Sequence, residues 1–284
     1  MRVRRITVAP QVLEFASDDP IAARALAALY HAAPATSAEA TLRYALRRAP
    51  DADGWMATSP SRPDFGPAAL GDAWSFLEWR ATEDLLNAPA RDAVFLHAGG
   101  ADIGGRLVLI VGESGAGKST LVAHLLLRGH RMLGDDVVRF APADGAFSAV
   151  GRSLKLEANS LREMPLIATR CASGVVGTLL AAGCYYVSPA AIRRGWEAAA
   201  GRPWAVILLD AAERAGSSGV VRTSEGEAAV YVTQKVLGEA AGGAPRQEDL
   251  TVRLLDVLAD VTAYRALGSE PAAVAAALER EASR

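Results

Sequence analysis

The sequence predicts an α/β protein with a P-loop core and a small α+β module before it. Three observations predict this class. Beyond residue 90, apolar strand-like runs alternate with helical patterns. A glycine-rich loop of the form G-x-x-x-x-G-K-[ST] lies between one such strand and a helix. The segment Ala88-Pro89-Ala90 separates this part from a differently patterned first part. We therefore expect two domains, 1–90 and 91–284.

The first ninety residues read as a mixed module of strands and helices. Asp18, Asp19 and Pro20 are typical of a helix start, and apolar residues at helical spacing fill a second stretch. The expected strands are Val3–Val8, Val12–Phe15, Thr41–Arg47 and Gly54–Thr58, and the expected helices are Ile21–His31 and Pro67–Asn87.

The second part alternates strands with helices. After the apolar run Ala93–His97, the residues Arg106–Val111 read as a fully buried strand, and Leu121 to Leu126 give the next helix a wide apolar face. The later strands are expected at Val137–Phe140, Cys184–Val187, Trp204–Leu209 and Gly219–Thr223. The later helices are expected at Val230–Leu237, Gln247–Leu258 and Pro271–Glu281, with Ser224 and Glu227 as a capping box before the first of them.

Composition excludes several classes of protein. The chain has 284 residues, a formal net charge of −2 and two cysteines. That charge gives no electrostatic argument for nucleic acid or an anionic membrane as partner. Its longest apolar runs span about six residues, whereas a membrane helix needs about twenty. With no export signal and no zinc-ligand spacing, we expect a cytoplasmic protein. Lysine is rare, and its three positions are Lys118, Lys155 and Lys235.

The glycine-rich loop matches the phosphate-binding P-loop at every fixed position. Its glycines let backbone N–H groups close around phosphate oxygens, and the following helix offers its positive N-terminal end. Lys118 is expected to reach the β- and γ-phosphates of ATP, and the Ser119 hydroxyl to bind Mg²⁺. The expected nucleotide-binding residues are Gly112, Glu113, Ser114, Gly115, Ala116, Gly117, Lys118, Ser119 and Thr120.

Two motifs that other classes of P-loop protein carry are missing from the sequence. The sequence holds neither the Asn-Lys-x-Asp motif of GTPases nor the Leu-Ser-Gly-Gly-Gln signature of transporter ATPases. These differences favour a kinase that uses ATP or a stand-alone ATPase.

Phosphoryl transfer to a hydroxyl needs one carboxylate near the acceptor and another near the metal. Asp135 and Asp136 follow the P-loop helix as a pair, whereas Asp210 ends the apolar run 206–209 like a Walker B aspartate. The pattern alone leaves the metal ligand open between Asp136 and Asp210.

The stretch from His97 to Val138 resembles the catalytic core of the HPr kinase/phosphorylase family. It contains a histidine before the P-loop, the P-loop itself, the turn Arg128-Gly129-His130-Arg131, and the pair Asp135-Asp136 at matching spacing. The resemblance implies ATP-dependent phosphorylation of a serine hydroxyl. It implies that Asp135 is the base that orients the acceptor, that Asp136 is a metal-linked carboxylate, and that His97 lies close to both. It also implies assembly into homo-oligomers.

The family's Glu-Ile-Arg-Gly-x-Gly signature is absent, and Arg152-Ser-Leu-Lys155-Leu occupies part of that region. The chain is more similar to the divergent HPr-kinase-related proteins, which include kinases of ribosomal peptides, such as lasso precursors, and of free serine. Many of these share such a segment, so Arg152 and Lys155 are candidate cations for the transferred phosphoryl group. The candidate catalytic residues are thus His97, Lys118, Asp135, Asp136, Arg152 and Lys155.

The expected function is an ATP-dependent kinase acting on a serine of a peptide or protein, such as a ribosomal natural-product precursor. The alternatives are a small-molecule kinase, for free serine or another metabolite, and a nucleotide-sensing regulatory protein that binds ATP without transfer.

Overall fold

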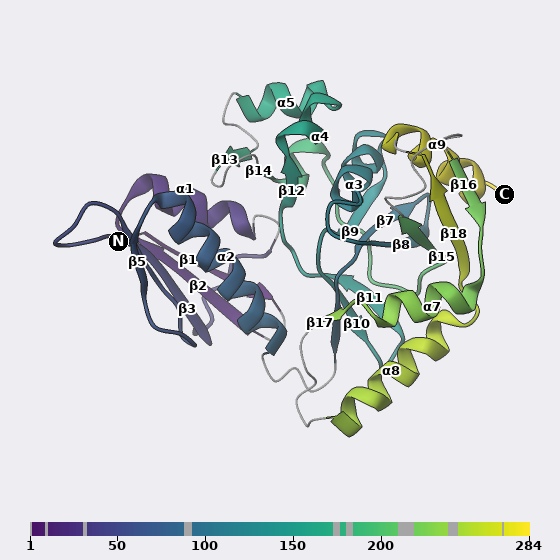
Figure 1. Ribbon diagram of the computed structural model, residues 1–284, viewed down its shortest axis with the longest axis horizontal. Helices are drawn as coiled ribbons and strands as arrows, with labels where there is room; N and C mark the ends of the chain where they lie inside the picture. Colours follow the sequence, from purple (N-terminus) through teal and green to yellow (C-terminus); the bar gives the residue numbers. More distant parts are fainter. Residues whose placement is uncertain are drawn as a thin grey trace. The chain divides into compact units, whose positions relative to one another are not determined.

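The computed structural model describes residues 2–8, 11–30, 33–87, 93–172, 177–179, 184–209, 219–237, 244–268 and 270–284. The chain forms mixed sheets and helices, as the predicted α/β class requires (Figure 1). It divides into two compact units: Met1–Ala88 with Gly151–Ala191, and Pro89–Val150 with Ile192–Arg284.

This division differs from the predicted domains, because residues 151–191 group with the first unit rather than with the P-loop. The physical reason is local packing. Ser153 donates its backbone N–H to the Leu29 carbonyl at 3.1 Å. The rings of Trp74 and Tyr186 lie 4.4 Å apart. No change in composition marks this return of the chain to the first unit.

The first unit is built on a five-stranded sheet in the order β1-β2-β3-β4-β5. The strands are β1 Arg2–Val8, β2 Gln11–Ser17, β3 Leu42–Arg48, β4 Trp55–Thr58 and β5 Phe65–Ala68. Strands β2 and β3 pair in parallel, and the other pairs are antiparallel. Helices α1 Pro20–Leu29 and α2 Leu70–Asn87 contact this sheet and each other (Figure 1).

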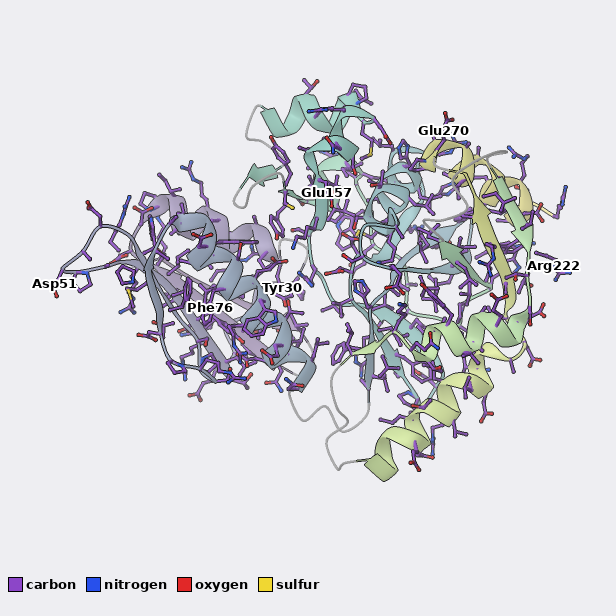
Figure 2. The ribbon with its side chains drawn as sticks, in the orientation of Figure 1. Tyr30, Asp51, Phe76, Glu157, Arg222 and Glu270 are labelled. Carbon is purple, nitrogen blue, oxygen red and sulfur yellow. The ribbon has the colours of Figure 1, made fainter. Side chains whose placement is uncertain are left out.

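Aromatic rings and a buried ion pair hold this unit together. Tyr30, which caps α1 (Figure 2), stacks on Phe15 with centroids 6.0 Å apart. Arg80 and Asp84, both on α2 and both buried, form an ion pair of 2.9 Å. The Tyr44 hydroxyl donates to the same Asp84 carboxylate at 3.0 Å, so the pair is hydrogen-bonded as a buried charge must be.

A smaller sheet in the order β12-β14-β13 completes the first unit. Its strands are β12 Leu154–Glu157, β13 Gly177–Leu179 and β14 Cys184–Val187. Helices α4 Ala158–Arg162 and α5 Pro165–Ala172 follow β12, and α6 Pro189–Ile192 leads out of the unit.

The second unit contains a six-stranded sheet in the order β16-β18-β15-β8-β7-β9. Its central strands β18, β15 and β8 run parallel, and the outer pairs are antiparallel. The strands are β7 Gly99–Ile103, β8 Arg106–Gly112, β9 Arg131–Gly134, β15 Ala205–Leu209, β16 Gly219–Arg222 and β18 Thr262–Leu267.

Helices cover both faces of this sheet. On one face, Leu109 and Val206 belong to a buried cluster with residues of α7 Glu225–Thr233 and α8 Ala244–Leu258. Helices α3 Lys118–Leu127 and α9 Pro271–Ala282 pack on each other and on β7 (Figure 1). Side chains alternate along a strand, so the strand residues between those that face α7 and α8 point to the opposite face, toward α3 and α9.

A second sheet of this unit has the order β11-β10-β6-β17. Its strands are β6 Val94–Leu96, β10 Val138–Ala141, β11 Ala146–Ala149 and β17 Val236–Leu237. The chain passes from this sheet to the large one at His97, directly after β6 and before β7.

Several sequence-based expectations need correction. The expected helix Val230–Leu237 ends at Thr233, and its last two residues form β17 because they pair with β6. The helix expected from Pro67 begins at Leu70, since β5 occupies the residues before it. Strands β7, β9, β11 and β18 were not predicted as separate elements. No helix in the described ranges is long and apolar enough to cross a bilayer.

An ion pair between the end of α3 and α9 makes a testable contribution to stability. The Glu279 carboxylate accepts hydrogen bonds from Arg128 Nε at 2.8 Å and from His130 Nε2 at 2.7 Å. The hydrogen bond from Arg128, with a smaller contribution from His130, lowers the pKa of Glu279 from 4.5 to about 2.

We therefore expect Glu279→Gln to lower the free energy of unfolding at pH 7 by about 2 kcal/mol. Since the folded pKa lies below the ordinary one, this contribution is complete above pH 4.5 and disappears as the pH falls toward about 2. Urea unfolding of both chains at several pH values between 7 and 3 measures it, with Asp256→Asn on α8 as control. A deficit of the variant that stays constant over this range would contradict the assignment.

Candidate active site

Three segments of the second unit converge at one edge of the large sheet. Strand β8 ends there at Gly112, where the P-loop starts. Strand β7 begins there, since Gly99 pairs with Ile110 near the end of β8. Strand β9 ends there, because Gly134 pairs with Gly100. The sheet register therefore places the P-loop, His97 and the acidic pair at a common edge.

The P-loop turns directly into α3. Gly117 has φ of +96°, a left-handed conformation that favours glycine, and Lys118 is the first helical residue. Lys118 is buried, and its Nζ donates to the carbonyl oxygens of Gly112 at 2.9 Å and Glu113 at 3.1 Å. Burial lowers the pKa of Lys118, while the charges of Asp136 and Asp135 act in the opposite direction. The ammonium is thus held at the loop, with acidic groups near enough to stabilise it.

His97 links the P-loop lysine to the acidic pair. Lys118 Nζ lies 3.0 Å from His97 Nε2, and His97 Nδ1 lies 3.1 Å from both the carbonyl oxygen and Oδ1 of Asp136. A lysine ammonium only donates hydrogen bonds, so Nε2 accepts and the ring proton resides on Nδ1. The Nδ1–H then donates to Asp136. The contacts form one continuous path from the phosphate loop to a carboxylate.

The two aspartates of the pair have different environments. Asp135 is 1% exposed, whereas the Asp136 side chain is 36% exposed. Asp136 has φ of +68°, an uncommon value for a residue with a side chain. The family resemblance assigns the acceptor to Asp135 and the metal to Asp136, and these roles stay predictions. In this structure Asp136 is the more exposed of the two carboxylates.

Sequence reasoning missed two side chains at the P-loop. Lys235 Nζ forms an ion pair with Glu113 Oε1, and the Tyr231 hydroxyl donates to the same oxygen at 3.1 Å. These hydrogen bonds lower the pKa of Glu113. Burial lowers the pKa of Lys235, but the hydrogen bonds and charges of Glu113 and Tyr231 together outweigh burial and raise it. The rarity of lysine was the one sequence signal that could have drawn attention to Lys235.

Arg152 and Lys155 belong to the first unit, whereas the P-loop belongs to the second. Both bind the carboxylate of Glu78 on α2, with Arg152 at 2.9 Å and Lys155 at 3.1 Å. Arg152 is buried, and Glu78 supplies the compensating charge that a buried guanidinium requires. The structure thus gives these two cations a defined local partner. Their predicted catalytic role stays a prediction.

The choice of metal ligand between Asp136 and Asp210 stays open. Asp210 lies outside the described residues, which reach Leu209 opposite Gly112 in the sheet. Among the described residues, no group of three or more His, Cys, Asp or Glu side chains could hold a metal ion. Ser119 and Asp136 are the described candidates for a metal that is also bound by phosphate oxygens.

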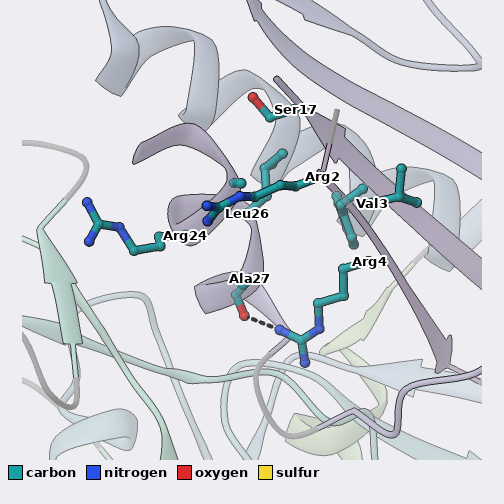
Figure 3. A pocket seen from close by; sticks show the side chains of 9 residues that line it. Arg2, Val3, Arg4, Ser17, Arg24, Leu26 and Ala27 are labelled. Atoms are coloured by element: carbon teal, nitrogen blue, oxygen red, sulfur yellow. Dashed lines mark hydrogen bonds between the residues drawn. The ribbon is translucent and has the colours of Figure 1, made fainter. Parts of the chain in front are cut away.

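The first unit has a pocket of its own, of about 220 Å³, between β1 and α1 (Figure 3). Arg2, Arg4 and Arg24 surround an apolar lining that includes Phe15 and Leu26. Arg4 donates to the carbonyl oxygens of Ala27 and Tyr30 at the end of α1. The cationic rim suits a ligand that carries both apolar and acidic groups.

Comparison with known proteins gives matches over the P-loop segment. Residues 91–166 match the family model of the HPr Serine kinase C-terminal domain. The HPr kinase/phosphorylase of Clostridium beijerinckii is 42% identical over 66 residues, which make up 23% of this chain and 21% of that protein. The corresponding protein of Aromatoleum aromaticum is 41% identical over 56 residues, covering 20% and 18%.

The matches thus span about a fifth of the length of these relatives. Among solved structures, the Hpr(Ser) kinase/phosphatase from Coxiella burnetii aligns with 66% of this chain and 90% of its own, at 14% identity and a TM-score of 0.35. The predicted resemblance to the HPr kinase/phosphorylase family is therefore confirmed, and it rests on residues 91–166.

Proposed function

We propose that this protein is a kinase that transfers the γ-phosphoryl group of ATP to a serine-type hydroxyl of a peptide or protein. The observation that carries the proposal is the path of contacts Lys118–His97–Asp136. It joins a phosphate-binding cation to an accessible carboxylate through a single imidazole. Asp135 lies next to it, so the site holds the two carboxylates, one for the metal and one for the acceptor, that transfer to a hydroxyl requires.

The residues around the P-loop fit a triphosphate. The left-handed Gly117 brings the loop to the N-terminus of α3, where the first N–H groups of the helix and the helix dipole attract anions. Lys118 now donates to two main-chain carbonyls and would exchange these bonds for phosphate oxygens. Glu113, Ser114 and Gly115 are exposed, so the loop is open to a ligand.

The acidic pair would serve the acceptor and the metal. Ser119 and Asp136 are the proposed ligands of Mg²⁺, which supplies Lewis-acid stabilisation of charge on the phosphate oxygens. The other carboxylate, that of Asp135, would orient the serine hydroxyl for in-line attack and receive its proton. His97, donating to Asp136, would fix that carboxylate relative to Lys118.

Two features support a peptide or protein as acceptor. One is the similarity to HPr kinase/phosphorylase proteins over the P-loop segment. The other is the pocket of the first unit, whose arginine rim and apolar lining suit a peptide with acidic and apolar side chains. A ribosomal natural-product precursor is the acceptor we propose, with the homo-oligomer as the working assembly.

Lys118→Ala is expected to weaken ATP binding by at least tenfold and to abolish phosphoryl transfer, since it removes the buried cation at the phosphates. Lys118→Arg is expected to be inactive as well, because the larger planar guanidinium does not fit where the slim ammonium lies. Calorimetric ATP binding and transfer of labelled γ-phosphate to a panel of serine peptides and free serine measure both effects. Full activity of either variant would refute the P-loop mechanism.

Substitutions of Asp135 and Asp136 are expected to differ in how ATP binding depends on Mg²⁺. Asp135→Asn and Asp136→Asn should each retain ATP binding in the absence of metal and lose transfer by at least a hundredfold. The variant that lacks the metal ligand should also need more Mg²⁺ for tight ATP binding, and we expect this of Asp136→Asn. Titration of ATP affinity against Mg²⁺ measures it. If both variants kept normal transfer, the acidic pair would not belong to the active site.

A further inference from the structure

A carboxylate occupies the second position of the P-loop. Glu113 is 72% exposed there, on a loop whose proposed ligand carries several negative charges. An unpaired carboxylate at this place would repel a triphosphate. In this structure the carboxylate is paired, because the Lys235 ammonium and the Tyr231 hydroxyl both donate hydrogen bonds to Glu113 Oε1.

Lys235 is fixed from its backbone as well as from its side chain. Its carbonyl oxygen accepts the backbone N–H of His97 at 2.7 Å. The next residue, Val236, pairs with Leu96 in the small sheet. The side chain is 13% exposed, and Nζ lies 4.7 Å from the centroid of the Tyr231 ring. The ammonium is therefore already ordered beside the P-loop, and little conformational entropy is lost when it binds a further partner.

The position of Lys235 relative to the other site residues indicates which phosphate it would meet. Its backbone bonds to His97, the residue that contacts both Lys118 and Asp136. Lys118 in a P-loop serves the β- and γ-phosphates, and the acceptor must approach the γ-phosphate. The Lys235 ammonium lies at Glu113 of the loop, and its charge also acts on Lys118. From these two positions we infer that it faces the part of the loop that holds the terminal phosphate.

We propose that Lys235 is a second phosphate-binding lysine of the P-loop, which contacts the terminal phosphate and makes the site prefer ATP to ADP. The inference rests on the proposed function in that it takes the loop's ligand to be ATP. Glu113 and Tyr231 position the ammonium before the nucleotide arrives. Once bound, the γ-phosphate replaces or shares the Glu113 carboxylate as the partner of Lys235.

The test compares ATP and ADP affinities of the full-length chain by calorimetry, with Mg²⁺, for the unaltered protein and for Lys235→Met and Lys235→Arg. Lys235→Met keeps the apolar stem over Tyr231 and removes the charge. We expect it to weaken ATP binding about tenfold or more and ADP binding less than about twofold. Lys235→Arg should retain most of the preference for ATP, and Glu113→Gln should bind ATP at least as tightly as the unaltered chain.

Arg253→Met on α8, where the arginine pairs with Asp249 on the same helix, is the matched control for loss of one cation. Equal losses for ATP and ADP in Lys235→Met would reduce Lys235 to a structural support of the loop and overturn the inference. Unchanged affinity for both would overturn it as well, and so would an unaltered chain without affinity for ATP.

Failure of the proposed function has a different signature. If the unaltered chain prefers ATP, and Lys235→Met loses that preference, the inference stands even when no peptide or free serine is phosphorylated. The kinase proposal alone would then be wrong. If transfer occurs and Lys235→Met keeps the preference for ATP, the kinase proposal stands and the role of Lys235 falls. Circular dichroism of each variant confirms that the chain is folded.

Discussion

The site depends on one imidazole that holds two opposite charges at a fixed separation. His97 accepts from Lys118 and donates to Asp136, and this is possible because the ring has two distinct nitrogens. The ring is placed by a change of sheet. Strand β6 ends at Leu96 in the small sheet, and β7 begins at Gly99 in the large one. At the same break the backbone N–H of His97 donates to the carbonyl oxygen of Lys235.

The sequence predicted the chemistry at this edge better than the sheets that build it. The P-loop is recognisable because its glycines and lysine have fixed spacing. Strand β7 was not predicted because it begins with two glycines, which are rare in strands. Close packing explains one of them, since a Cβ on Gly100 would lie 2.9 Å from Leu133 Cδ2. Strand β18 was missed because Arg265 interrupts its apolar pattern. That arginine pairs with Glu227 at the sheet, a long-range contact that no local pattern contains.

The three lysines also show that contacts between residues far apart in the sequence are hard to predict from local patterns. Each has an acidic or basic partner far away in the sequence: Lys118 has His97, Lys155 has Glu78, and Lys235 has Glu113. The motif identified the first, and the family resemblance singled out the second. The third, Lys235, lay in an expected helix, and no role was assigned to it from the sequence. Only the pairing of β17 with β6 brings it to the P-loop, and pairing of a two-residue strand cannot be read from its sequence.

The backbone of the acidic pair shows why Asp136, rather than its neighbour, is joined to His97. With φ of +68°, Asp136 presents its carbonyl oxygen and its carboxylate to the same imidazole nitrogen, each at 3.1 Å. A left-handed residue with a side chain costs free energy that the surrounding contacts must offset. Here the tight turn also bonds Val137 N–H to the Asp135 carbonyl at 2.8 Å, and the Asp135 residue is buried. The two aspartates thus differ in exposure and in their contact with His97, although their side chains are identical. A site in which one carboxylate binds the metal and the other orients the acceptor requires such different environments.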